Sequence, residues 1–369
     1  MTLSIIIVSY NTKELLEQCL ESIVKSLTNS NSETNRHPDE NQDHPNGSKT
    51  ILNQVQNDDS GKSVKNKAPN ISYEIIVVDN NSTDGTREYL EKLQTTNFKF
   101  QISSKLQTNS KIPTFAKASA GKQNLKVILN EENTGFTKAN NQGIKESRGE
   151  YVLLLNSDTR ITEKNFFTKI IAFLDKNKQV GILGPKLVWE NGQVQPSGGY
   201  FPTLPRLFTW ALMLDDLPLI NKIIKPYHPH EPGFYTKDSY YQKSHYQDWV
   251  TGACFFIKRA VINKIGLLDE NIFMYTEEME YCYRAQKFNF KIVYYPQASL
   301  IHLGGKSGTS LSAAKNEFWG IKYFYQKHQP TWQKIIVSFL LKKAAFLRKI
   351  VFYNNQEKRN IYRQILADL

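Results

Sequence analysis

Four short apolar runs, separated by helical patterns, limit most strongly how this chain can fold. The runs occupy residues 3–9, 73–79, 125–129 and 151–155. They are rich in Ile, Val and Leu without polar alternation, which is typical of strands buried on both faces of a parallel sheet. Helical spacing follows the first three runs, over residues 13–27, 86–93 and 136–147. Strands that alternate with helices predict a doubly wound α/β sheet flanked by helices.

Two stretches interrupt this alternation. Residues 28–70 contain no Phe, Trp or Tyr and are crowded with Asn, Ser, Asp and Lys, so we expect a disordered insertion there. Residues 94–123 form a weaker insertion of the same kind. After an irregular stretch over 202–246, a helix is expected over 277–288 and a short strand over 291–295. The 369 residues therefore suggest one domain over 1–310, with two insertions, and a helical basic tail over 311–369.

The chain is basic, with 47 Lys and Arg against 35 Asp and Glu, a net charge of +12. Such an excess suggests nucleic acid, an anionic membrane or a phosphorylated ligand as partner. About half of it lies in residues 331–369, which hold eight basic residues against two acids. Residues 335–353 are also strongly apolar, which favours an amphipathic helix on an anionic membrane over a helix that only packs on the domain. No nucleic-acid-binding motif occurs, so no nucleic-acid partner is expected.

The cysteines and the apolar runs indicate the cellular compartment in which the protein works. Cys19, Cys254 and Cys282 are scattered without CxxC spacing, which indicates reduced core residues of a cytoplasmic protein. The chain begins almost directly with a strand pattern and has no basic leader, so no signal peptide is expected. No uncharged apolar run is long enough to predict a transmembrane span. We therefore expect a cytoplasmic protein, peripheral at the inner face of the cell membrane.

Polar residues gather where each predicted strand ends. The segments are SYN at 9–11, DNNSTDG at 79–85, NTGF at 133–136 and NSD at 156–158. Each could be an ordinary turn, but the carboxyl ends of parallel strands share one sheet edge, where ligands bind. No GxGxxG, GxxxxGK[ST] or GxSxG segment occurs. A dinucleotide site, a P-loop and a hydrolase nucleophile elbow are therefore disfavoured.

Seven segments, in this order, resemble one enzyme family: SIIIVSYN, IIVVDNNSTDGT, NTGFTKANNQGI, LLLNSD, DWVTGACFFIKR, GLLDENIFMYTEEMEYCYRA and IHLGGKS. The family is that of the inverting glycosyltransferases of family 2, and the rhamnosyltransferase-like branch is the most similar. The resemblance spans about residues 2–310 without the insertions. It implies a GT-A fold and transfer of rhamnose or another hexose from a dTDP- or UDP-linked donor. The implied acceptor is a glycan or lipid-linked glycan in cell-surface polysaccharide synthesis.

The resemblance also implies roles for individual residues. Those that would bind the nucleotide sugar are Ser9, Tyr10, Asn11, Asp79, Ser82, Asp84, Asn133, Gly135, Phe136, Asn140, Asn156 and Ser157. Asp79 would accept a hydrogen bond from a pyrimidine N3–H. Asp158 and His302 would hold Mg²⁺ or Mn²⁺, with Asn156 standing where many relatives carry a first Asp. Lys306 and Ser307 would lie over the diphosphate.

The acidic cluster Glu277, Glu278 and Glu280 supplies the implied general base, Glu278, while Trp249, Gly252 and Glu277 would face the acceptor. Alternatives remain for these residues. The acids could stand at the helix N-terminus only because the helix dipole favours negative charge there. Trp249 could equally be a buried core residue. Asn156 and Glu278 also replace Asp residues of the family. They leave open a catalytically lapsed homologue that binds nucleotide sugar or glycan.

Overall fold

The structure is a computed structural model that describes residues 1–29, 71–95, 125–215, 217–229, 240–304 and 310–369. The expected insertions over 28–70 and 94–123 lie outside the described residues except at their edges. There, helix α1 (Lys13–Asn29) and helix α2 (Thr86–Thr95) each continue two residues further than their sequence patterns predict.

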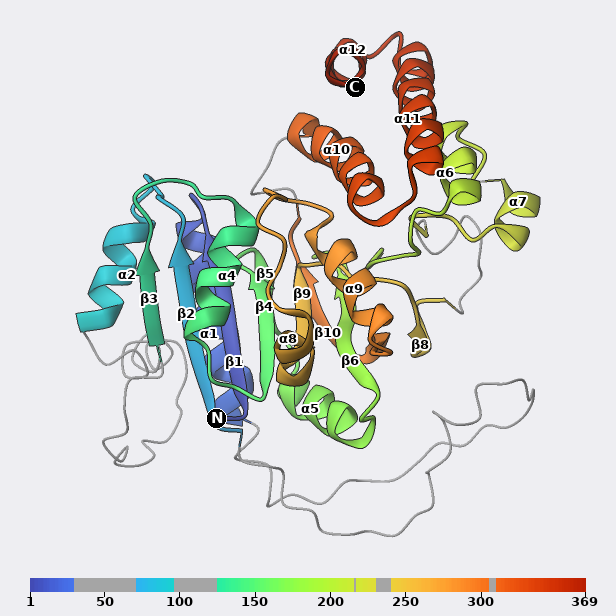
Figure 1. Cartoon of the computed structure of the whole chain (residues 1–369). Helices are drawn as coiled ribbons and strands as arrows, with labels where there is room; N and C mark the ends of the chain where they lie inside the picture. Colours follow the sequence, from blue (N-terminus) through green and yellow to red (C-terminus); the bar gives the residue numbers. More distant parts are fainter. Residues whose placement is uncertain (30–70, 96–124, 216, 230–239, 305–309) are drawn as a thin grey trace.

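One mixed sheet, ten-stranded within the described ranges, forms the centre of the molecule (Figure 1). Four parallel strands come first, in the spatial order β3 (Leu125–Leu129), β2 (Tyr73–Asp79), β1 (Leu3–Ser9) and β4 (Tyr151–Asn156). The chain runs outward from β1 to β3 and then returns to the other side of β1 with β4. This reversal creates a switch point between β1 and β4, where open α/β sheets bind ligands.

The second half of the sheet is partly antiparallel. Strand β9 (Cys254–Lys258) pairs antiparallel with β4 and with β6 (Val180–Val188), and β10 (Lys291–His302) runs parallel to β6. Three two-residue strands complete the edges: β5 (Thr159–Arg160), β7 (Val194–Gln195) and β8 (His245–Tyr246). The prediction of a short strand at 291–295 was wrong in length. A register shift between Tyr295 and Ser299 passes Pro296, so the strand continues to His302.

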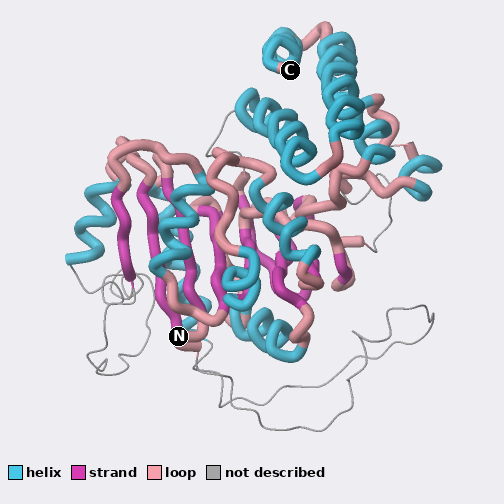
Figure 2. The backbone as a smooth tube through the Cα atoms, viewed as in Figure 1, coloured by secondary structure: helices cyan, strands magenta, loops and turns pink. Residues whose placement is uncertain are grey.

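Helices cover both faces of the sheet (Figure 2). Apolar side chains of α1 and α5 (Phe166–Lys176) pack in one core with Leu3, Ile5 and Ile7 of β1. The alternate residue, Ile6, faces the second core with α4 (Phe136–Glu146), α8 (Arg259–Ile265) and α9 (Glu277–Lys287). The buried runs thus contribute to both cores, as their lack of polar alternation predicts. The predicted fold class, a doubly wound mixed sheet flanked by helices, is confirmed.

The C-terminal part is helical, as expected. Helices α10 (Ser310–His328), α11 (Thr331–Val351) and α12 (Gln356–Asp368) pack on one another and on α6 (Leu204–Ala211), with α7 (Pro218–Ile223) beside α6 (Figure 1). Phe318, Ile321 and Leu341 join these helices to the second core. No helix of the described ranges is both long and apolar enough to span a membrane.

All three cysteines are buried and free, which confirms them as core residues. Burial raises the pKa of the Cys19 thiol to about 12 and holds those of Cys254 and Cys282 well above their usual range. Such thiols are unreactive at neutral pH.

Candidate active site

Three adjoining cavities open at the carboxyl edge of the sheet, around the switch point. The strand-end cavity has a volume of about 150 Å³ and is lined by Val8, Tyr10, Asn80, Asn133, Phe136, Asn156, Ser157, Phe273, Met274, Ser312 and Asn316. The acidic cavity has the same volume and is lined by Phe136, Asn156, Asp158, Thr251, Gly252, Ala253, Met274, Tyr275, Glu277, Glu278 and His302. The aromatic cavity, about 300 Å³, is lined by Tyr227, His228, Trp249, Tyr275, Thr276, Glu278, Met279, Ala313, Ala314 and Glu317. Glu278 and Tyr275 line both the acidic and the aromatic cavity.

Asn80, directly after β2, organises the wall of the strand-end cavity. Its amide Nδ2 donates to Asn133 Oδ1 at 2.7 Å, and its Oδ1 accepts from the Thr134 backbone N–H at 3.1 Å. Asn133 Oδ1 also accepts from the Gly135 N–H at 3.0 Å. These bonds fix the loop before α4, so that Phe136 lies at the boundary of two cavities.

The loops that follow β1 and β2 are joined by hydrogen bonds. Asn11 Oδ1 accepts from the Thr83 N–H at 2.7 Å, and the Asn11 N–H donates to Ser82 Oγ at 2.9 Å. Asp84 accepts from the first N–H groups of two helices, Lys13 of α1 at 2.9 Å and Thr86 of α2 at 3.1 Å. Slight burial opposes ionisation of Asp84, but a hydrogen bond from the Thr86 hydroxyl together with these two backbone bonds outweighs it and lowers the pKa of Asp84.

Several predicted residues are buried beneath the cavities. Ser9 Oγ is 2.9 Å from Thr12 Oγ1, which is 2.9 Å from Ser157 Oγ, so a hydroxyl chain links β1 to β4. Asn140 donates to the Phe136 carbonyl at 2.9 Å within α4. Asp79 is fully buried and accepts from the Ser82 N–H at 3.1 Å through one oxygen, while its Oδ1 has no partner.

Asp158 and His302 meet in the acidic cavity, although they come from opposite halves of the sheet. Asp158 is buried, and its Oδ1 has no hydrogen-bond partner and lies 3.4 Å from His302 Nε2. His302 Nδ1 is 2.8 Å from Gln195 Oε1, an oxygen that can only accept. Nδ1 therefore carries a proton, and Nε2 faces the acidic cavity beside the carboxylate.

Glu277 and Glu278 begin α9 at the other wall of the acidic cavity. Burial and the neighbouring Glu278 raise the pKa of Glu277 well above its usual range. Burial also raises the pKa of Glu278, against the opposing effect of hydrogen bonds from its own N–H, the Glu277 carboxyl and the Gly252 N–H. Glu277 is thus the protonated member that donates, and Glu278 carries the charge when the pair holds one proton.

The backbone before α9 is strained. Tyr275 and Thr276 both adopt left-handed conformations, with φ of 65° and 68°. Residues with side chains avoid this region, and consecutive examples persist only where the surrounding packing holds them. Thr276 packs against Gly320 of α10, where an added Cβ would lie 2.0 Å from Thr276 Oγ1. This turn aims the first residues of α9 at the cavities.

The aromatic cavity shares Glu278 with the acidic cavity but is not lined by Asp158. Trp249 and Tyr227 are almost wholly buried in its wall, and Trp249 Nε1 donates to the Tyr200 carbonyl at 3.3 Å. His228 Nε2 lies 2.9 Å from Glu317 Oε1 of α10, so a polar pair faces Glu278 across the cavity.

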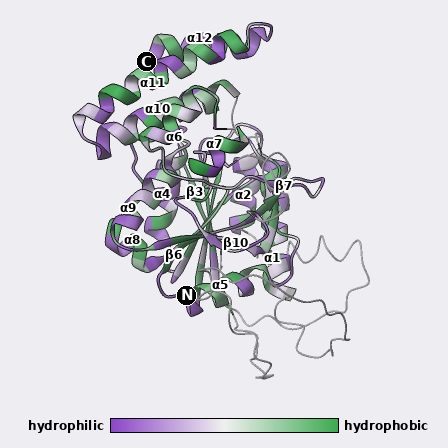
Figure 3. Ribbon diagram, turned by 90° about the vertical axis from the view of Figure 1, so that its right-hand side faces the viewer, coloured by the Kyte–Doolittle hydropathy of each residue, from purple (hydrophilic) through white to green (hydrophobic). Residues whose placement is uncertain are grey.

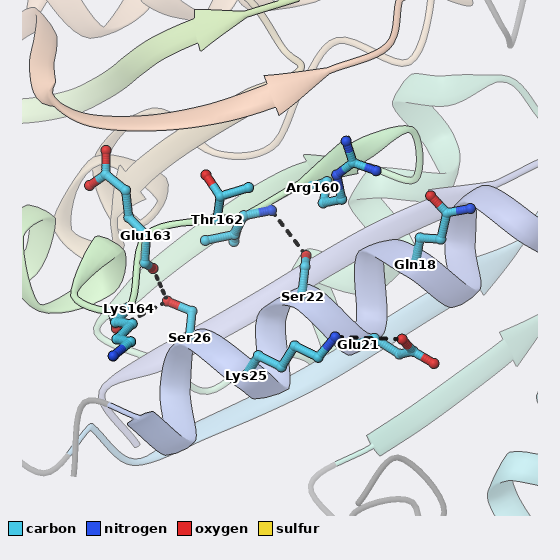
Figure 4. Close-up of a pocket in the computed structure, with 10 residues that line it drawn as sticks. Gln18, Glu21, Ser22, Lys25, Ser26, Arg160, Thr162, Glu163 and Lys164 are labelled. Carbon is cyan, nitrogen blue, oxygen red and sulfur yellow. Dashed lines mark hydrogen bonds and ion pairs between the residues drawn. The ribbon is translucent and has the colours of Figure 1, made fainter. Parts of the chain in front are cut away.

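A hollow larger than these three cavities, about 570 Å³, lies elsewhere. It runs between α1 and the segment after β5, and none of the predicted site residues lines it (Figure 4). Its polar groups bond within the protein: Ser22 Oγ accepts from the Ile161 N–H at 3.0 Å, and Ser26 Oγ donates to the Glu163 carbonyl at 2.8 Å. Size alone therefore does not mark it as a site.

Residues 59–266, more than half of the chain, match the family described as "Glycosyl transferase family 2". The chain belongs to glycosyltransferase family 2.

Two curated relatives are similar to part of this family member. One is the "Low-salt glycan biosynthesis hexosyltransferase Agl10" of Haloferax volcanii, 27% identical over 43% of this chain and 46% of the relative. The other is the "N-acetylglucosaminyl-diphospho-decaprenol L-rhamnosyltransferase" of Mycobacterium tuberculosis, 24% identical over 51% of this chain and 59% of the relative. The matched region thus spans only about half the length of each relative. A solved structure, mannosyltransferase PcManGT from Pyrobaculum calidifontis in complex with GDP-Man and Mn2+, is 13% identical, with a TM-score of 0.48 over 100% of this chain and 74% of that one.

The structure sorts the residues that the family resemblance proposes. Those that line the three cavities are Tyr10, Asn133, Phe136, Asn156, Ser157, Asp158, Trp249, Gly252, Glu277, Glu278 and His302. Ser9, Asn11, Asp79, Ser82, Asp84, Gly135 and Asn140 lie beneath or beside the cavities and shape the loops. Lys306 and Ser307 lie outside the described residues. Glu280, the third acid, faces away and pairs with Arg284, Lys327 and His328.

The family implies a divalent cation. The residues of the acidic cavity fit one whose ligands come partly from the protein and partly from the bound substrate. In the described ranges, no three His, Cys, Asp or Glu side chains group closely enough to hold a metal alone. Asp158 Oδ1 and Asn156 Oδ1 are nevertheless buried oxygens without partners, and His302 Nε2 stands beside the first. Mg²⁺ in such sites takes one or two protein oxygens together with substrate phosphates and water. The residues present therefore fit a metal that arrives with a phosphorylated ligand.

Sequence reasoning missed the residues that support or complete the site. They are Asn80, Gln195, Tyr275, His228, Ser312, Asn316 and Glu317. Asn80 stands within the polar segment after β2, which was a usable signal. Gln195 and the residues of α10 had none, because their positions depend on how distant segments pack.

Proposed function

We propose that this chain is an inverting glycosyltransferase that moves a hexose from a nucleoside-diphosphate sugar to a hydroxyl of a glycan or lipid-linked acceptor. The observation that carries the proposal is the position of Glu278. Its carboxyl lines the wall shared by the acidic and aromatic cavities, with one oxygen unpartnered. A base at this boundary can take the proton of a hydroxyl bound in one cavity while that hydroxyl oxygen attacks a sugar carbon held in the other.

The proposed reaction is a single displacement. The acceptor hydroxyl oxygen attacks the anomeric carbon, its proton passes to the Glu278 carboxylate, and the bond from that carbon to the diphosphate oxygen breaks. The diphosphate departs with the electron pair, so the anomeric configuration inverts. Glu277, protonated at the start, donates to Glu278 and orients its carboxylate. General base catalysis of this kind is typically worth about 10²–10⁴-fold in rate.

We propose that the nucleotide lies in the strand-end cavity and the diphosphate near Asn156 and Asp158. Asp79 Oδ1, buried without a partner, suits a pyrimidine N3–H, in keeping with a dTDP- or UDP-linked donor. Asp158 and His302 would hold Mg²⁺ or Mn²⁺, which when bound stabilises the negative charge of the departing diphosphate. Gln195 keeps the proton on Nδ1 of His302 and so leaves Nε2 available.

The setting of the reaction is also a proposal. We place residues 1–310 as the catalytic domain and 311–369 as a helical extension whose first helix supplies Ser312 and Glu317 to the cavities. The enzyme would work in the cytoplasm at the inner face of the cell membrane, in cell-surface polysaccharide synthesis. The donor sugar is rhamnose or another hexose, in line with the two curated relatives.

The test combines donor binding with turnover. A panel of nucleotide sugars with Mn²⁺ should raise the melting temperature for the true donor, because a ligand that binds only the folded state stabilises it. Glu278→Gln should retain that shift but lose turnover by at least about 100-fold. Glu88→Gln, an exposed acid on α2, serves as the matched control and should keep turnover. Donor binding without turnover in the wild type would instead support a lapsed, binding-only homologue.

A further inference from the structure

Exposed apolar side chains concentrate on three helices, and on the short segments next to them, remote from the sheet. Twenty large hydrophobic residues are exposed in the described ranges, and fourteen of them lie within 208–223 or 332–353. Single exposed hydrophobic residues are normal on a protein surface, whereas a concentration of this kind marks an interaction site. The helices concerned are α6, α7 and α11.

Helix α11 is apolar on two opposite faces. Val337, Leu341 and Ala344 are buried against the neighbouring helices. The outer face carries Trp332, Ile335, Ile336, Phe339, Phe346 and Ile350, all exposed and spaced as one stripe of a helix. Ile335 is 68% exposed and Phe339 is 59% exposed. A helix that served only to pack on the domain would carry polar residues there.

Helices α6 and α7 extend this face. The Trp210 ring of α6 lies 4.2 Å from the Arg348 guanidinium, and the Trp210 carbonyl accepts from Arg348 at 3.0 Å, which fixes α6 on α11. Phe208 remains exposed on the other side of α6. On α7, Leu219 and Ile223 are one turn apart and 77% and 85% exposed. Both views place α6 and α7 next to the C-terminal helices, and α7 and α11 carry hydrophobic turns (Figures 1 and 3).

The basic residues around this face indicate which kind of partner it binds. Helix α11 contains no acid and five basic residues: Lys334, Lys342, Lys343, Arg348 and Lys349. Lys343 Nζ lies 5.3 Å from the Phe339 ring, and Lys349 Nζ lies 5.2 Å from the Phe346 ring, so their stems run along the apolar stripe. Trp332 stands exposed in the first turn of the helix and Tyr353 just after its end, as aromatic residues do at a membrane interface. A second copy of the chain would meet this surface with like charge, whereas anionic lipid complements it.

We propose that α6, α7 and the outer face of α11 form one docking surface that lies on an anionic phospholipid bilayer. The α6–α7 segment is thus a second membrane contact in addition to the C-terminal helices. Tyr227 and His228 of the aromatic cavity follow α7 within five residues, and the intervening chain spans at most about 18 Å. The cavity therefore opens close to the bilayer, which suits an acceptor anchored there; this last step rests on the proposed function.

An environment-sensitive fluorophore tests whether both helices enter the bilayer. The native cysteines are buried, so nitrobenzoxadiazole can be attached selectively at Ile223→Cys, Ile335→Cys and a distant exposed control, Phe288→Cys. Vesicles of phosphatidylglycerol and phosphatidylcholine should shift the emission to the blue at positions 223 and 335 and leave position 288 unchanged. Pure phosphatidylcholine should give a much weaker response. An unchanged signal at position 223 would overturn the proposal, and so would a vesicle-independent shift that grows with protein concentration, since it would indicate self-association.

A paired variant separates docking from catalysis. Leu219→Glu with Ile223→Glu should reduce vesicle binding at least about tenfold, because two buried apolar side chains are lost from the contact. Tyr246→Glu with Phe288→Glu, which changes two exposed hydrophobic residues outside these three helices, should bind vesicles like the wild type. Donor-induced stabilisation reports that each variant is folded. Glu278→Gln should bind vesicles normally, so loss of turnover and loss of docking are distinguishable. If the Leu219→Glu, Ile223→Glu variant bound vesicles as strongly as the wild type, the docking inference would be wrong. The proposed reaction would not be affected.

Discussion

The carboxyl groups of Glu277 and Glu278 are buried side by side, so at most one of them carries charge readily at neutral pH. Because burial raises the pKa of Glu277, its stabilising contribution is complete below the unfolded pKa and is lost as pH rises through the folded value. Glu277→Gln removes this penalty while keeping a hydrogen-bond donor toward Glu278.

We therefore expect Glu277→Gln to melt above the wild type near pH 8 and the difference to shrink toward about pH 4. Each unit of pKa shift relieved corresponds to about 1.4 kcal/mol. Thermal unfolding across this range measures the effect, with Glu88→Gln as the control that should show no such trend. A difference that narrows with rising pH would contradict the assignment of the proton to Glu277.

Gln195 acts on the site through His302. Its Oε1 accepts from Nδ1 and so presents Nε2 toward Asp158. Replacing such an orienting partner typically weakens metal affinity about 10–100-fold. We expect Gln195→Ala to weaken Mn²⁺ binding in the presence of UDP by this factor, as measured by electron paramagnetic resonance titration. Gln193→Ala, at an exposed residue whose side-chain oxygen accepts from nearby Asn191, should leave the affinity unchanged.

At the scale of elements, the start of α4 depends on the absence of a side chain at Gly135. Its φ is 86°, and an added Cβ would lie 2.6 Å from the Phe273 ring. The Phe273 carbonyl accepts from the Phe136 N–H at 2.8 Å, so the loop before α9 and the first turn of α4 are held together here. Both cavities that Phe136 lines depend on this contact.

Gly135→Ala should therefore lower both stability and donor affinity. Gly135 has a ψ of 164°, a combination open almost only to glycine that costs a residue with a side chain about 1–3 kcal/mol, and the clash adds about 1–3 kcal/mol of overpacking. Gly192→Ala is a matched control, because Gly192 also has a positive φ of 82° but open space around it. Urea unfolding should show the greater loss for Gly135→Ala, and only this variant should weaken nucleotide-sugar binding. Equal losses would show that backbone strain alone matters.

At the scale of the whole molecule, an ionic network fastens helix α10 to α9 and to the loop before it. Lys327 of α10 lies 2.7 Å from both Asp269 and Glu280, and Glu280 also pairs with Arg284 at 2.9 Å. Although burial opposes ionisation, hydrogen bonds from Lys327 and its neighbours hold the pKa of both carboxyl groups below their usual range. Their contribution to stability is thus present above the unfolded pKa and lost as pH falls.

Lys327→Met should destabilise the protein by roughly 1.5–3 kcal/mol at neutral pH, since buried acceptors lose a charged hydrogen bond. The deficit should shrink progressively as pH falls below about 4, because the carboxyl groups of the folded wild type take up protons only as pH approaches their lowered pKa values. Lys315→Met, on the same helix but in an exposed pair with Asp368, should cost less than about 1 kcal/mol. Chemical unfolding at both pH values measures these differences. A pH-independent deficit would count against the network.

The sequence by itself determined the central elements and the edge at which the site lies. Apolar runs and helical spacing report local burial, so the first three strands and the start of α9 fall where the patterns place them. Polar segments after those strands then had to meet, because parallel strands end at one edge. The full length of strand β10 was not predicted, because pairing resumes after a bulge at Pro296, beyond the apolar run.

Only the tertiary structure decided which side chains meet across the site. The approach of His302 to Asp158, the Gln195 contact and the entry of α10 into the cavities depend on packing between segments far apart in the chain. No local pattern encodes such partners. The same holds for α11, whose sequence shows an apolar helix but not which face is left uncovered. Local periodicity determines which residues are buried. Packing between distant segments determines which residues they are buried against.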